Sequence, residues 1–84
     1  MKTLIIMYPT MERAVMAWNE TCSKYSSLIR KAYRNPLRIK LINDSEWLFK
    51  SETEGLRAIR GFHGEIFPSA CFSIDERMGE EFAE

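Results

Sequence analysis

The 84-residue chain has few of the segments and residues that identify a class of protein directly. Its apolar run at residues 4–7 is far too short for a signal peptide or for a membrane span, which needs about 20 residues. Its two cysteines, Cys22 and Cys71, fit neither a metal-ligand spacing nor a disulfide framework. We therefore predict free thiols in a reducing compartment, and a cytoplasmic protein that does not enter a membrane.

The chain also lacks an excess of either charge. Twelve basic residues balance twelve acidic ones, so net charge predicts neither a nucleic-acid nor a membrane partner. The charges are nevertheless separated along the sequence. Residues 1–40 carry eight basic and two acidic groups, whereas residues 41–84 carry four basic and ten acidic groups. Such polarity is typical either of a binding face or of two halves that pair in the fold, and we favour the pairing.

Residues that perform catalysis are scarce. His63 is the single histidine, and no serine or cysteine is recognisably paired with it as a nucleophile, so we expect a structural or exposed side chain. No glycine-rich phosphate-binding loop occurs in the chain. We therefore predict no catalytic residue, no cofactor and a protein that is not an enzyme.

The residues that are present predict one small α/β (or α+β) domain over residues 1–84. Residues 3–8 form an unalternating apolar run, which is typical of a strand buried on both faces. Thr10 is a good N-cap for a long helix whose apolar residues recur at steps of three and four up to the Asn35-Pro36 step. Weak helix formers at Ser26-Ser27 leave a break in its middle open.

The second half of the chain predicts three further strands. Residues 37–41 alternate apolar and basic, and with residues 47–50 they form an antiparallel hairpin around Asn43-Asp44-Ser45. Residues 69–74 form the last strand, and residues 77–84 a short acidic helix or frayed tail. The predicted order is β-α-β-β-β, a four-stranded mixed sheet with one long helix on one face. A face without cover would meet a partner or a second copy.

Short motifs along this order resemble a known family. They are Leu4-Ile5-Ile6-Met7-Tyr8-Pro9-Thr10, Ile39 to Asn43-Asp44-Ser45, Phe49-Lys50-Ser51, Arg60-Gly61 and Phe72-Ser73-Ile74-Asp75-Glu76. Over about residues 3–76 the chain resembles the middle of the ATPase domain of phage terminase large subunits and, more loosely, helicase-like ATPases. The resemblance implies that Asp75 would hold magnesium and Glu76 would activate water. The family's phosphate-binding loop is missing, which removes the support those roles need.

The candidate sites each have a structural alternative. Asp75 and Glu76 are the only metal candidates, but Asp75 at the start of a terminal helix would equally serve as its N-cap. The basic residues of segment 24–40 would contact nucleic acid, or would be a solvated helix face. Arg57 and Arg60 would bind an anion, or would lie in a surface loop. The candidate contacts are Lys24, Arg30, Lys31, Arg34, Arg57 and Arg60.

Three functions remain open from the sequence. The first is a non-enzymatic interaction module, phage-encoded as the resemblance implies, with a reduced ATPase-like fold that binds or inhibits another protein through Trp47, Phe49 and Phe62. The second is a nucleic-acid-binding module that uses the basic stretch 24–40. The third is a metal-dependent nuclease or ATPase at Asp75 and Glu76, which would need a further carboxylate such as Asp44 or Glu65. We favour the first.

Overall fold

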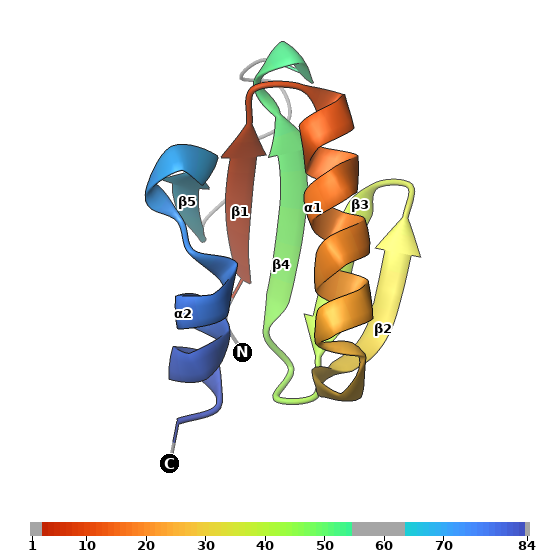
Figure 1. Cartoon of the computed structure of the whole chain (residues 1–84), viewed down its shortest axis with the longest axis vertical. Coiled ribbons are helices and arrows are strands. Elements are labelled where there is room, and N and C mark those ends of the chain that lie inside the picture. The colour runs from red at the N-terminus through yellow and green to blue at the C-terminus, as the bar shows by residue number, and fades with distance from the viewer. Residues whose placement is uncertain (1–2, 55–63, 84) are drawn as a thin grey trace.

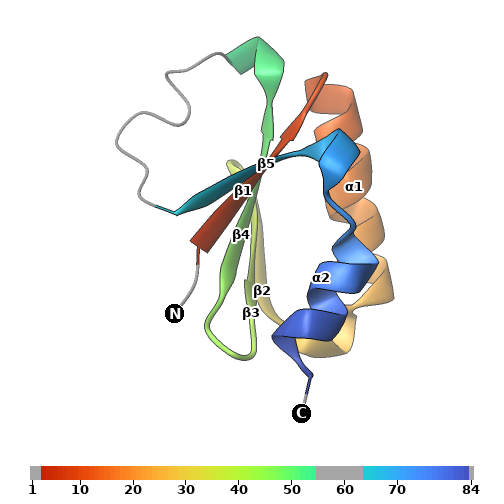
Figure 2. The same cartoon turned by 90° about the vertical axis from the view of Figure 1, so that its left-hand side faces the viewer.

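A single mixed sheet carries two helices on one of its sides (Figure 1, Figure 2). The computed structural model describes residues 3–54 and 64–83. Within them the chain forms five strands, whose order across the sheet is β2-β3-β4-β1-β5. The elements are β1 (Thr3–Tyr8), α1 (Met11–Lys24), β2 (Ile29–Arg34), β3 (Leu37–Leu41), β4 (Glu46–Ser51), β5 (Glu65–Pro68) and α2 (Ile74–Glu81), with 3-10 turns at Ser26–Leu28, Glu52–Glu54 and Ser69–Cys71. The predicted α/β class is confirmed, but the sheet has five strands rather than four and the helices are short.

β1 lies between two parallel neighbours. It pairs with β4 on one side, where Ile6 lies opposite Phe49, and with β5 on the other, where Ile6 lies opposite Phe67. The residues of its apolar run, Leu4, Ile5 and Ile6, are each at most 1% exposed. This two-sided burial explains why the strand shows no alternation of apolar and polar residues.

The other half of the sheet is antiparallel. β3 and β4 form the predicted hairpin, and β2 adds to the free edge of β3. The prediction that residues 29–34 continue the helix is therefore wrong. Their apolar positions fit helical spacing, but this segment supplies the backbone partners that β3 needs along its second edge. A two-residue turn at Asn35-Pro36 joins the two strands.

α1 begins where the sequence predicts and ends earlier. The Thr10 side chain accepts a hydrogen bond from the Arg13 backbone N–H at 3.2 Å, so it is the N-cap. The helix ends at Lys24, just before the weak helix formers Ser26-Ser27, which are the position at which the sequence allows a break. It packs over β3, β4 and β1, and the Trp18 indole donates to the Arg38 carbonyl at 3.2 Å.

The C-terminal segment also differs from its prediction. Residues 69–74 form no strand; the last strand is β5 at Glu65–Pro68, and Pro68 ends it because a proline donates no ladder hydrogen bond. Ser73 rather than Asp75 caps α2, since its hydroxyl accepts from the Glu76 N–H at 3.3 Å. Residues 77–81 are helical rather than frayed.

The apolar core lies between the sheet and the two helices. Alternation along each strand turns one set of side chains toward α1 and α2. The core set is Leu4, Ile6, Tyr8, Ala14, Leu37, Ile39, Leu41, Trp47, Phe49 and Met78. The residues between them on β3 and β4 therefore point to the opposite side, which no described helix or strand covers (Figure 2).

Candidate functional site: a basic sheet face

Basic side chains gather on the side of the sheet away from the helices. Arg38 and Lys40 alternate with the core residues of β3, and Lys50 alternates with those of β4. In the register of the sheet Lys31 lies opposite Lys40, and Tyr33 lies opposite Arg38. These five residues, which we call the basic sheet face, therefore lie on one surface of three adjacent strands.

Few carboxylates neutralise this face. The one acidic side chain among these positions is Glu46, whose carboxylate lies 3.5 Å from the Arg38 guanidinium. Over residues 3–54 and 64–83, no carboxylate lies within ion-pair distance of the ammonium groups of Lys31, Lys40 or Lys50. Four cations against one anion leave an excess of three positive charges. Lys31 and Lys40 also stand directly opposite each other, and like charges in this arrangement destabilise a pair of strands. On its other side, Lys40 lies opposite Glu46.

Tyr33 lies among these cations. The Arg38 guanidinium carbon is 4.0 Å from the centroid of the Tyr33 ring, and the Lys31 ammonium is 5.1 Å from it. Both distances are within the range of cation–π attraction. The ring is half-buried, so part of it remains open to solvent. The basic sheet face thus combines charge with an aromatic plane.

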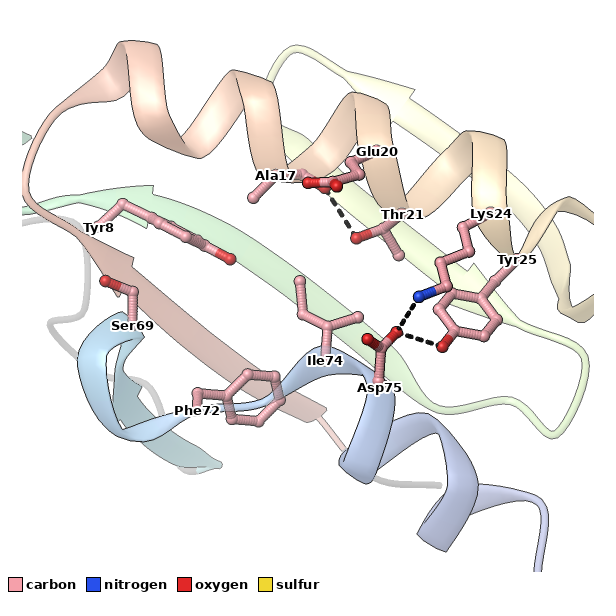
Figure 3. Close-up of a pocket in the computed structure, with 10 residues that line it drawn as sticks. All are labelled: Tyr8, Ala17, Glu20, Thr21, Lys24, Tyr25, Ser69, Phe72, Ile74 and Asp75. Atoms are coloured by element: carbon pink, nitrogen blue, oxygen red, sulfur yellow. Dashed lines mark hydrogen bonds and ion pairs between the residues drawn. The ribbon is translucent and has the colours of Figure 1, made fainter.

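A hollow lies on the helix side of the sheet, between α1 and the segment that leads into α2 (Figure 3). Its volume is about 280 Å³, and an adjoining hollow of about 820 Å³ extends it toward Thr10 and Met16. Phe72, Ile74 and Ala17 provide an apolar lining, whereas hydroxyl and charged groups occupy its rim. We call the two hollows together the helix-side groove.

One end of the helix-side groove is closed by three polar side chains. The Asp75 carboxylate lies 2.8 Å from the Lys24 ammonium and accepts a further hydrogen bond from the Tyr25 hydroxyl (Figure 3). These two hydrogen bonds hold the pKa of Asp75 below its usual range. Further along the groove, burial and the nearby Glu20 carboxylate raise the pKa of Tyr8 to about 12. Asp75 is therefore a link between the two helices, engaged by a cation of the chain itself.

The two metal candidates lie at the start of α2 rather than at the tip of a strand. Asp75 and Glu76 occupy its first turn, where negative charge is favourable near the helix N-terminus. No group of three His, Cys, Asp or Glu side chains that could hold a metal ion occurs in the part of the chain that the structure describes. Asp44, one proposed third carboxylate, is paired with Arg30 at 2.6 Å, and Glu65, the other, with Arg77 at 3.2 Å.

The predicted nucleic-acid contacts do not share one surface. Lys24 pairs with Asp75 on the helix side, and Arg30 pairs with Asp44 beside the β3–β4 turn. Arg34 lies 5.8 Å from the Trp18 ring on the helix side, so of the four predicted contacts that the structure describes, Lys31 alone lies on the basic sheet face. These pairs also confirm, for Lys24 and Arg30, that the basic and acidic halves of the chain meet. Four predicted residues lie outside the described part of the chain: Arg57, Arg60, Phe62 and His63.

The predicted protein-binding anchors that the structure describes lie in the core. Trp47 is 0% exposed and Phe49 is 1% exposed, so neither offers a surface to a partner. Arg38 and Lys40 belong to the basic stretch 24–40 that the sequence offers as a nucleic-acid surface, whereas Lys50 is not among the predicted contacts. The apolar–basic alternation of residues 37–41 assigns Arg38 and Lys40 to one face of β3. Lys50 could have been placed on the same face only from the pairing of residues 46–51 with that strand, because residues 46–51 do not alternate apolar and basic.

Comparison with known proteins supplies no family for this chain. No family model, curated protein or solved structure matches it. The resemblance to terminase and helicase-like ATPases therefore stays a prediction. None of the described helices is long and apolar enough to cross a membrane. Any assignment of function depends on the two surfaces described above.

Proposed function

We propose that the protein is a nucleic-acid-binding module and that it binds the phosphate backbone on the basic sheet face. The observation that carries this proposal is the set of three lysines, Lys31, Lys40 and Lys50, that share one open surface without an ion-pair partner among the described residues. Phosphates attract such clusters, because each contact releases counterions from the nucleic acid.

The contrast with three basic side chains elsewhere in the fold supports the proposal. Lys24, Arg30 and Arg77 each have a carboxylate within 3.2 Å, so their charges are already compensated inside the molecule. On the basic sheet face, Lys31 instead faces Lys40 across the β2–β3 pair. A like-charge pair opposes folding; an anionic ligand would remove that repulsion on binding.

Fluorescence anisotropy with a labelled oligothymidine of about 12 nucleotides tests the proposal. We expect binding at low salt that weakens with a slope of about −2 to −3 in log K against log salt, as three to four phosphate contacts would give. Lys31→Glu should weaken binding about five- to tenfold and make the slope shallower by about 0.7. Arg13→Glu is the matched control, since it makes the same charge change on the exposed surface of α1, on the helix side.

Two outcomes would contradict the proposal. The first is an absence of binding at low salt. The second is an equal affinity for polyglutamate, which would assign the basic sheet face to an acidic protein segment. That result would favour a protein partner, which is also the function that the sequence favours. The partner would then bind the basic sheet face and not the buried Trp47 and Phe49.

A further inference from the structure

A row of stackable and apolar side chains crosses the face on which the lysines lie. In the register of the sheet, Tyr33 on β2 is opposite Arg38 on β3, and Arg38 is opposite Leu48 on β4. With strands about 4.8 Å apart, this row is about 10 Å long. It begins at an aromatic ring with a guanidinium carbon 4.0 Å from its centroid and ends at the half-buried Leu48, because the next position, Ile5 on β1, is only 1% exposed.

The lysines flank this row on both sides. On one side of the row, Lys31 is two residues from Tyr33 along β2, and Lys40 is two residues from Arg38 along β3. On the other side of the row, Lys50 is two residues from Leu48 along β4. Two residues along a strand correspond to about 6.6 Å. A strand of nucleic acid that lay along this row would therefore have ammonium groups within reach of its phosphates, while its bases faced the Tyr33 ring and the Arg38 guanidinium.

We infer that the ligand is single-stranded nucleic acid and that Tyr33, together with the Arg38 guanidinium stacked on it, is the platform on which a base stacks. The inference rests on the proposed function and specifies its ligand. Phosphate contacts alone would accept a duplex, whose bases are already stacked and paired. A ring beside a guanidinium increases the affinity by stacking only when the faces of the bases are free, as they are in a single strand.

Substitution of Tyr33 separates stacking from charge. Tyr33→Ala should lower the affinity for the oligothymidine by about 5- to 150-fold, the range that corresponds to loss of one stacked base. It should leave the salt slope unchanged, because no phosphate contact is lost. Tyr33→Phe keeps the ring and should bind like the wild type. Circular dichroism of each variant checks that the sheet is still formed.

An abasic strand of the same length separates this inference from the proposed function. We expect the wild type and Tyr33→Ala to bind it with equal affinity, and the wild type to bind it and a duplex more weakly than the oligothymidine. Wild-type binding of the abasic strand as tightly as of the oligothymidine, or unchanged oligothymidine binding by Tyr33→Ala, would overturn the inference while leaving phosphate binding intact. No binding of any strand would overturn both.

Discussion

Along β4, successive side chains belong to two different environments. Trp47 and Phe49 are buried under the helices, whereas Glu46, Leu48 and Lys50, on the opposite side of the same strand, are only partly buried. On the helix side, the β4 side chains belong to the apolar core that holds the fold together. The other side carries an excess of positive charge that does not help folding. On β3 and β4 the fully buried side chains lie on the helix side, which leaves the other side of these two strands available for binding; β1, by contrast, is buried on both faces.

The largest effect that we expect comes from truncating the helix side. Trp47→Ala should lower the free energy of unfolding by about 3–5 kcal/mol, because it removes a fully buried ring and leaves a cavity. Leu48→Ala, one residue along and on the other side, should cost only about 1 kcal/mol, since Leu48 is half-buried. Urea denaturation of both variants measures the difference. Equal losses of unfolding free energy in the two variants would mean that both sides of β4 contribute to the core, which would contradict the difference between them.

A smaller effect of opposite sign is expected on the basic sheet face. Lys31→Glu converts the like-charge pair with Lys40 into an opposite-charge pair, so it should raise stability by about 0.2–1 kcal/mol at low salt. The gain should shrink as salt screens the charges. The same substitution weakens nucleic-acid binding under our proposal. A loss of stability on substitution, measured by thermal unfolding at low and high salt, would show that the lysine pair is not repulsive.

The smallest effect concerns the link between α1 and α2. The hydrogen bonds from Lys24 and Tyr25 lower the pKa of Asp75 relative to its ordinary value of 3.8, so folding favours the ionised form. The stabilisation is therefore complete above that ordinary value and is lost as pH falls through the lowered folded-state pKa. Asp75→Asn should be slightly less stable than the wild type at neutral pH, and the gap should close in acid. A gap that does not change with pH would exclude ionisation as its cause.

The sequence predicted the elements whose signals are local. Thr10 as N-cap and the hairpin of residues 37–41 with 47–50 are confirmed, because capping and alternation depend on neighbouring residues. For residues 29–34 the sequence predicts helix, because Ile29, Ala32 and Tyr33 recur at helical steps. Their strand conformation depends on pairing with β3, which helical periodicity does not reveal. β5 is four residues long and depends on pairing with the distant β1.

The candidate site was predictable only in its charge. The excess of basic residues in segment 24–40 predicted a phosphate-contacting surface, yet Lys24, Arg30 and Arg34 lie elsewhere in the structure. The basic sheet face combines residues from three strands, including Lys50 from beyond that segment. Which residues lie on the basic sheet face depends on strand register, because register fixes the side of the sheet that each side chain occupies. Register in turn follows from tertiary pairing.

The central claim is that the two faces divide stability from binding, and NMR titration of the isotope-labelled protein with the oligothymidine tests it most directly. We predict that the signals of Lys31, Tyr33, Arg38 and Lys50 shift together and saturably, while those of the helix-side groove, such as Thr21 and Ile74, do not. Shifts confined to the helix-side groove, with the basic sheet face unperturbed, would contradict the account.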